Sequence, residues 1–200
     1  MRHKNGKKTA SVLGMLLLTV ILIGLYQRGR LHGDSGDGSQ VTDGQTVYSF
    51  AMGTSVSVSL YDAPGGEEEK LAQAVKNLDE QEISWRQEGS ALYRLNHSYT
   101  AGQETMISDT LYVALTQAYN ICKDSEGALD ITIRPLANLW NIESATAEDF
   151  VIPDKSQITT ALAKTGYESV TIGEDKSVTL AKPGMILDLG AVGKGFALDV

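Results

Sequence analysis

Hydrophobic and polar residues alternate strictly in one early segment of the chain, SVSVSLY at residues 55–61. Val56, Val58 and Leu60 share one side of this segment, whereas serines occupy the other. A period of two with one apolar side predicts a half-buried β-strand. The sequence APGG at residues 63–66 then predicts a turn.

Two longer segments repeat their apolar residues at helical spacing instead. The first is predicted to run from Glu67 to about Ile83, and its acidic first turn suits the helix dipole. The second is predicted from about Asp109 to Lys123, with Ser108 as the N-cap and Gly127 marking its end. The apolar faces consist of Leu71, Ala74, Val75 and Leu78 in the first helix, and Leu111, Ala114, Leu115, Ala118 and Cys122 in the second.

Shorter elements follow towards the C-terminus. A third helix is predicted around residues 155–164, and strands at 169–172 and 177–180 are joined by a GEDK turn into a hairpin. Residues 185–187 predict one more strand, which leads directly into a glycine-rich segment. Because strands and helices do not alternate regularly, the sequence predicts the α+β class, with a mixed sheet and packed helices.

The N-terminus has a composition of its own. Residues 1–30 contain six Lys and Arg and no acid, and 18 uncharged residues run from Thr9 to Tyr26. That length is typical of a membrane-spanning helix or a secretory leader. No small-residue cleavage site follows, so we expect residues 1–30 to be a signal peptide that stays as a membrane anchor, its basic end in the cytoplasm.

This anchor predicts the organisation of the rest of the chain. Residues 31–45 are rich in Gly, Ser and Asp and bury little apolar surface, which predicts a flexible linker. Residues 46–200 then form the folded domain, on the extracytoplasmic side of the cell membrane. The alternative for the N-terminal segment is a buried core helix, which leaves its flanking charges unexplained.

Charge excludes one large class of partner. Residues 31–200 carry 11 Lys and Arg against 25 Asp and Glu, and an acidic surface repels nucleic-acid phosphates. Nucleic acid is therefore not expected as a partner. Cys122 is the single cysteine of the sequence, and its place on an apolar helix face predicts a buried, inert thiol.

The closing segment, LDLGAVGKGFALDV at residues 187–200, raises the question of a phosphate loop. It fails the Walker A pattern at two positions, and its glycine spacing reverses that of a Rossmann fingerprint. A strand followed directly by a glycine-rich turn still predicts backbone N–H groups that are free to bind an anion. Asp188 would add a hydrogen-bond acceptor and Lys194 a positive charge at the same place. The alternative is a tight strand-to-helix turn with solvated charges.

Three other stretches carry candidate chemistry. In GALDITIRPLANLW, at residues 127–140, Asp130 is a charge among apolar neighbours, which is costly unless it is paired. The tripeptide MGT at residues 52–54 precedes the alternating strand, and by itself it indicates only a turn. In ISWRQEGSALYRLN, at residues 83–96, the aromatic residues serve either to stack on a flat ligand or to fill the core.

Taken in this order and at these separations, the four stretches resemble one family, the ApbE-type FAD:protein FMN transferases. The resemblance covers residues 52–199. It implies an enzyme that binds FAD, cleaves its pyrophosphate with Mg²⁺ and transfers FMN to a Ser or Thr hydroxyl of a target flavoprotein, releasing AMP. Such targets are subunits of membrane redox pumps or extracellular flavoproteins.

The resemblance also assigns roles to individual residues. Ala191 matches the position whose backbone carbonyl ligates Mg²⁺, and Arg86 stands where the family usually has an aromatic that helps to hold FAD. No catalytic residue is expected in this chain, because the attacking hydroxyl belongs to the target protein. The expected FAD-binding residues are Met52, Arg86, Ala128, Leu129, Asp130, Asp188 and Lys194.

In the family the chain continues past the closing motif and supplies further metal ligands. We therefore expect residues 46–200 to be the N-terminal part of a truncated, ApbE-like domain that is inactive and poorly stable alone. Three alternatives stay open on the sequence: a FAD pyrophosphatase that passes FMN to water, a membrane-tethered module that binds flavin or protein without catalysis, and a plain extracytoplasmic structural domain.

Overall fold

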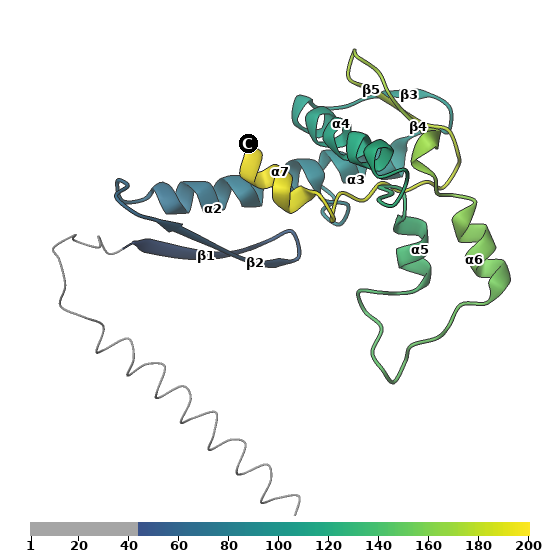
Figure 1. Ribbon diagram of the computed structural model, residues 1–200, viewed down its shortest axis with the longest axis horizontal. Coiled ribbons are helices and arrows are strands. Elements are labelled where there is room, and N and C mark those ends of the chain that lie inside the picture. Colours follow the sequence, from purple (N-terminus) through teal and green to yellow (C-terminus); the bar gives the residue numbers. More distant parts are fainter. Residues whose placement is uncertain (1–43) are drawn as a thin grey trace, which may run out of the picture. The chain divides into compact units, whose positions relative to one another are not determined.

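The computed structural model describes residues 44–200. The expected membrane anchor at residues 1–30 and nearly all of the expected linker at 31–45 lie outside the described residues. Within residues 44–200, no helix has the length and apolar character needed to cross a membrane. The helices and strands, shown in Figure 1, are β1 (Gln45–Ala51), β2 (Thr54–Leu60), α2 (Glu67–Leu78), the π-helical turn η1 (Asp79–Ile83), α3 (Ala91–Ser98), β3 (Glu104–Met106), α4 (Asp109–Asp124), α5 (Arg134–Leu139), α6 (Lys155–Leu162), the 3₁₀ turn η2 (Tyr167–Ser169), β4 (Val170–Ile172), β5 (Ser177–Leu180) and α7 (Gly193–Asp199).

The alternating segment forms the strand that its pattern predicts. It is β2, which pairs antiparallel with β1 over the full length of both strands, and its valines and leucine are half-buried. Helix α2 packs against both strands of this hairpin (Figure 1). Strand β1 already begins at Gln45, the last residue of the expected linker.

The β1–β2 hairpin closes through a two-residue turn, Met52-Gly53. Both residues have positive φ, 53° for Met52 and 69° for Gly53, and Ala51 pairs directly with Thr54 across the turn. Positive φ at both central residues defines a type I′ turn, whose twist matches that of the two strands. Gly53 adopts this conformation readily, whereas for Met52 it is strained because of its Cβ.

Helix α4 carries the buried core as its apolar pattern predicts. Ser108 is its N-cap, and its Oγ accepts a hydrogen bond from the Leu111 N–H at 3.2 Å. Gly127 follows the helix with φ 82°, and its N–H donates to the Cys122 carbonyl. The Cys122 side chain is fully buried, and this burial raises the pKa of its thiol, as expected for an inert cysteine.

The C-terminal hairpin is also confirmed, but the mixed sheet is not. Strand β5 pairs antiparallel with β4 on one side and with β3 on the other, in the order β3-β5-β4. Every strand pair among residues 44–200 is antiparallel, and the strands form two small sheets. The α+β class therefore holds, whereas the expected mixed sheet is not found among the described strands, because all of their pairs are antiparallel.

Residues 185–187 were predicted as a strand, and they are not one. Met185 and Leu187 are fully buried, as an apolar run predicts, but no neighbouring strand pairs with them. Instead, the side chain of Asn96 on α3 bonds the Leu187 backbone twice, accepting from its N–H at 2.8 Å and donating to its carbonyl at 2.9 Å. The Asp188 N–H then donates to the Ile131 carbonyl at 2.8 Å. The buried Asn96 amide thus makes the two backbone hydrogen bonds that a neighbouring strand would otherwise make.

Helices α5 and α6 lie side by side and are joined by a long loop (Figure 1). The sequence pattern did not predict α5, a short helix that starts at Arg134-Pro135, where proline at the first turn is favourable. Helix α6 was predicted, and Asp154 and Gln157 cap it reciprocally. The loop between them brings Glu143 back towards the pocket described below.

Replacing Asn96 with alanine should destabilise the domain by about 2 kcal/mol or more, because the buried Leu187 N–H and carbonyl lose their partners. Urea unfolding followed by circular dichroism measures this loss. Asn77, an exposed residue of α2, provides the control, and Asn77→Ala should cost about 0.5 kcal/mol or less. Equal losses in the two variants would show that the Asn96–Leu187 pair does not hold the closing segment.

Candidate functional site

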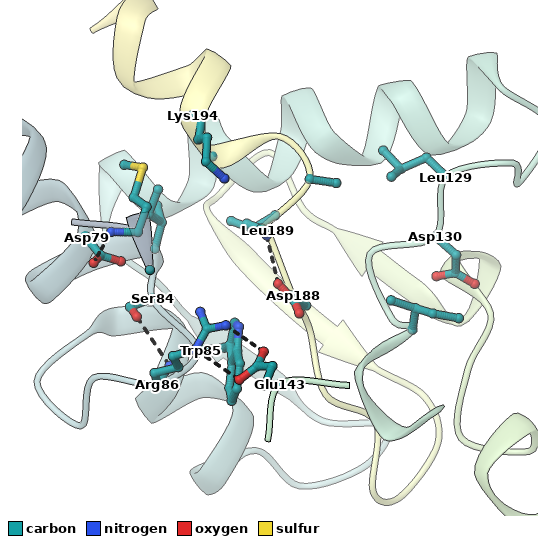
Figure 2. A pocket seen from close by; sticks show the side chains of 17 residues that line it. Asp79, Ser84, Trp85, Arg86, Leu129, Asp130, Glu143, Asp188, Leu189 and Lys194 are labelled. Atoms are coloured by element: carbon teal, nitrogen blue, oxygen red, sulfur yellow. Dashed lines mark hydrogen bonds and ion pairs between the residues drawn. The ribbon is translucent and has the colours of Figure 1, made fainter. Parts of the chain in front are cut away.

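Residues from five separate segments line one cavity of about 480 Å³. The segments are the β1–β2 turn, the π-helical turn η1 with the loop after it, the loop before α5, the loop after α5, and the closing glycine-rich segment. Figure 2 shows this pocket with its side chains. The lining residues are Met52, Gly53, Asp79, Ile83, Ser84, Trp85, Arg86, Leu129, Asp130, Ile133, Glu143, Asp188, Leu189, Gly190, Ala191, Gly193 and Lys194.

A carboxylate fixes the hairpin turn at the pocket. The Met52 N–H donates a hydrogen bond to Asp79 Oδ2 at 2.7 Å. Asp79 is half-buried and opens the π-helical turn η1, in which the regular hydrogen bonding of α2 gives way to wider turns. The turn ends as the Ser84 N–H donates to the Asp79 carbonyl, and the chain then continues along the pocket wall as Ser84, Trp85 and Arg86.

Two arginines and an indole form a second wall. The guanidinium carbon of Arg134 lies 3.2 Å from the Trp85 ring centroid, and that of Arg86 lies 4.1 Å from it. One oxygen of Glu143, Oε1, accepts from Arg86 at 2.6 Å and from Arg134 at 2.7 Å. Arg134 also reaches Asp188 Oδ2 at 3.3 Å. Because the guanidinium groups of Arg86 and Arg134 cover the indole, Trp85 stabilises both charges through cation–π contacts.

The charge of Glu143 depends on this wall. Burial of its carboxylate raises the pKa, but the hydrogen bonds and positive charges of Arg134 and Arg86 outweigh that effect. The net result is a pKa of Glu143 below its usual value of 4.5. Glu143 is therefore ionised at neutral pH, and it joins Arg86, which is half-exposed, to Arg134, which is almost completely buried.

The closing segment forms a tight turn that lines the pocket. Asp188 Oδ1 accepts from the Gly190 N–H at 2.8 Å, and the Leu189 carbonyl accepts from both the Val192 and Gly193 N–H groups. The sequence led us to expect free N–H groups in this turn. That expectation was wrong for Gly190, Val192 and Gly193, because the turn uses their N–H groups to close on itself.

Glycine at position 193 has a packing reason. A Cβ there would lie 3.2 Å from Ile83 Cδ1, so the start of α7 approaches the end of η1 at glycine distance. The segment presents the side chains of Asp188 and Lys194 to the pocket (Figure 2), and Ala191 also lines the cavity.

Asp130 and Leu129 lie on the other side of the pocket from Asp79 in this view (Figure 2). Asp130 Oδ1 accepts from the N–H of Thr132 at 2.8 Å and from its hydroxyl at 2.6 Å. These two hydrogen bonds from one residue stabilise the carboxylate that the sequence pattern singled out. They also fix the conformation of the loop before α5. Thr132 is fully buried, and its Oγ1 also accepts from the Gly166 N–H at 2.7 Å.

The structure brings most of the predicted site residues to one pocket. Ala128 is the exception: it is exposed and does not line the cavity, and its N–H closes a turn with the Ser125 carbonyl. The others are Met52, Arg86, Leu129, Asp130, Asp188, Ala191 and Lys194, which come from segments up to 142 positions apart in the chain.

Three residues of the site were missed on the sequence. Asp79 belonged to the polar part of a predicted amphipathic helix, and Glu143 lay in a polar loop, so neither gave a signal. Arg134 did give one, because it is a lone charge in the apolar run ITIRPL, as Asp130 is.

A metal centre made of side chains is not present in this part of the protein. Among residues 44–200, no group of three or more His, Cys, Asp or Glu side chains is placed to hold a metal ion. The pocket contributes oxygen donors of another kind, namely the single carboxylates of Asp79, Asp130, Glu143 and Asp188.

Comparison with known proteins adds to this geometry. Residues 52–200 match the ApbE family. The FAD:protein FMN transferase of Salmonella typhimurium is 32% identical over 167 residues, which make up 80% of this chain and 46% of that protein. The FAD:protein FMN transferase of Vibrio cholerae is 29% identical over 154 residues, or 74% of this chain and 45% of that protein.

Solved structures show the same likeness. An ApbE protein from Thermotoga maritima superposes with a TM-score of 0.69 at 25% identity, over 78% of this chain and 50% of that one. The flavin transferase ApbE from Vibrio cholerae superposes with a TM-score of 0.67 at 25% identity, over 78% and 52%. The chain thus spans about half the length of the relatives that it matches. Because the family match covers all four motifs and the pocket that they build, this chain belongs to the ApbE family.

Proposed function

We propose that this chain is part of a FAD:protein FMN transferase, which moves FMN from FAD to a Ser or Thr hydroxyl of a target flavoprotein and releases AMP. In this reaction the hydroxyl oxygen forms a bond to the FMN phosphorus. The bond from that phosphorus to the oxygen bridging to AMP breaks, and the hydroxyl proton is lost. The observation that carries the proposal is that four separate motifs meet at one pocket.

The pocket has the features that such a dinucleotide requires. Its volume is within the range typical of small-molecule sites, and it combines apolar walls with a few charged groups. Arg86 and Lys194 are available to phosphate oxygens, since both line the cavity and are exposed to solvent. Met52, Leu129 and Asp130 offer contacts for the rest of FAD.

The charge of the pocket supports a need for magnesium. Among its described lining residues, four carboxylates (Asp79, Asp130, Glu143 and Asp188) face two cations (Arg86 and Lys194), and the nearby cation Arg134 is already paired with Glu143 and Asp188. A pyrophosphate is itself negative, so its binding here requires a counter-charge that the side chains do not provide. Bound Mg²⁺ would neutralise the charge that develops on the transferred phosphoryl group.

These residues fit part of a magnesium site. Mg²⁺ binds oxygen ligands, keeps several waters and takes few protein groups beside substrate phosphates. The Ala191 carbonyl would be one protein ligand of the ion, and the Asp188 carboxylate keeps the turn around Ala191 closed by accepting the Gly190 N–H. The chain's own contribution is thus to shape the turn and bind the nucleotide.

The acceptor and the location complete the proposal. The nucleophile comes from the target protein, a membrane redox-pump subunit or an extracellular flavoprotein, so the pocket does not have to supply one. We propose that the enzyme lies at the cell membrane, with residues 1–30 as its single-pass anchor and the domain on the extracytoplasmic side. The reason is that basic residues flank an uncharged run of 18 residues in this segment.

Replacing Asp188 with alanine should weaken FAD binding at least about tenfold, because Asp188 holds both the glycine turn and the buried Arg134. Quenching of flavin fluorescence in a titration of FAD with Mg²⁺ measures the affinity. Asp124→Ala, at the exposed end of α4, is the control and should bind as the wild type does. Equal affinity of the Asp188 and Asp124 variants would contradict the pocket as the FAD site.

Incubation with FAD, Mg²⁺ and a flavoprotein acceptor separates transfer from hydrolysis. We expect AMP and covalent flavin on the acceptor to form together from the complete gene product, and neither from residues 46–200 alone. In-gel flavin fluorescence and chromatography of AMP measure the two products. AMP formation without acceptor labelling would instead indicate a FAD pyrophosphatase, and FAD binding without AMP would indicate a non-catalytic module.

Acid should selectively remove the contribution of Glu143. Because its pKa is lowered by folding, the ionised carboxylate stabilises the protein above pH 4.5, and this stabilisation is lost as the pH falls through the lower, folded value. Glu143→Gln should cost roughly 1 kcal/mol or less at pH 7, since the pair is partly exposed and screened. Urea unfolding of both proteins from pH 7 to pH 3 should show the difference shrinking, whereas a constant difference would contradict the ion pairs.

A further inference from the structure

The tip of the β1–β2 hairpin has a conformation that its own sequence does not favour. A type I′ turn requires positive φ at both central residues, and asparagine followed by glycine is the preferred pair. Here the first position is Met52, whose Cβ makes a φ of 53° unfavourable. Such a conformation persists only where the surrounding structure holds it.

The contact that holds the tip comes from a residue far away in the chain. Asp79 Oδ2 accepts the Met52 N–H at 2.7 Å, and a hydrogen bond to an ionised carboxylate is about twice as strong as one between neutral groups. Asp79 is set at the junction of α2 and the π-helical turn η1. Single π turns within helices are common at functional sites because they redirect a side chain out of the regular helical register.

Both partners of this hydrogen bond line the pocket. Figure 2 shows Asp79 on the same side of the pocket as Ser84 and Arg86. Because Asp79 takes the Met52 N–H, the tip has only the Met52 carbonyl and side chain and the Gly53 backbone with which to meet a ligand. The arrangement of these groups is therefore fixed by Asp79 before any ligand arrives.

We propose that Asp79 is a positioning residue for nucleotide binding: it holds the Met52–Gly53 turn in its left-handed conformation against the pocket, and through that turn it sets the affinity for FAD. The inference rests on the proposed function in naming FAD as the ligand. Asp79 acts through Met52 and is not itself a catalytic residue.

The test compares three variants of the full 200-residue chain. Asp79→Ala removes the acceptor, and Asp79→Asn keeps an amide oxygen for the Met52 N–H but removes the charge. Glu80→Ala is the matched control, because this neighbouring carboxylate pairs with Lys76 at 3.7 Å and does not line the cavity. FAD affinity is measured by fluorescence quenching with Mg²⁺, and hydrogen exchange of the Met52 amide is measured by NMR without ligand.

In Asp79→Ala we expect FAD to bind about tenfold more weakly and the Met52 amide to exchange at least about tenfold faster. Asp79→Asn should stay within about threefold of the wild type in both measurements, and Glu80→Ala should match the wild type. A merely structural role for Asp79 would lower the unfolding midpoint without this paired loss.

A rescue variant separates positioning from general stability. Met52→Asn creates the preferred Asn-Gly pair, which adopts the type I′ turn without outside support. In the Asp79→Ala background it should restore most of the lost FAD affinity, measured relative to the Met52→Asn single variant. Restored unfolding stability without restored affinity would overturn the inference.

The remaining outcomes are also decisive. Unchanged Met52 exchange in Asp79→Ala, or faster exchange with unchanged FAD affinity, overturns the positioning role while leaving the proposed function intact. A wild-type chain whose Met52 amide is protected but which binds no FAD refutes the proposed function, and with it the ligand named here.

Discussion

The buried guanidinium of Arg134 is the constraint on which the pocket depends. Its side chain is only 8% exposed, and a charge in that position is tolerated only when it is paired and hydrogen-bonded. Its partners are the Trp85 ring, Glu143, Asp188 and Asn138, which come from the loop after η1, the loop after α5, the closing segment and α5 itself. Satisfying one charge thus draws three walls of the cavity together.

The other walls are held by polar side chains that replace missing backbone partners. Asn96 serves as a strand edge for Leu187, and Asp79 accepts the N–H of a strained turn. In both cases a single buried or half-buried side chain fixes a backbone segment that its neighbours in sequence do not fix. Walls fixed in this way lower the entropy cost of binding a flexible ligand.

The pocket agrees with the family match, because all four motifs of that match contribute residues to it. The chain spans about half the length of the relatives that it matches, and its pocket carries more negative than positive side chains. It has a closed glycine turn and single carboxylates at one pocket, and among the residues described it lacks a side-chain cluster for a metal.

The local patterns of the sequence were enough to predict most elements. Strict alternation predicted β2, helical spacing predicted α2 and α4, and the turn signals predicted the β4–β5 hairpin, because each depends on residues within one or two turns of the chain. The lone charge of Asp130 was likewise visible, since burying a charge is costly wherever it occurs. The order of four motifs predicted the family before any geometry was known.

Pairing across long separations was not accessible in the same way. The pairing of β3 with β5, the loss of the strand at residues 185–187, the role of Asp79 and the contact of Glu143 with Arg86 all depend on partners 27 to 91 positions away. A polar residue in a helix or loop has the same local pattern whether it faces solvent or holds a distant backbone. The sequence by itself therefore determined the elements and the chemistry that they carry, and the tertiary structure alone decided which distant groups meet, because only packing brings a donor and an acceptor within hydrogen-bond distance.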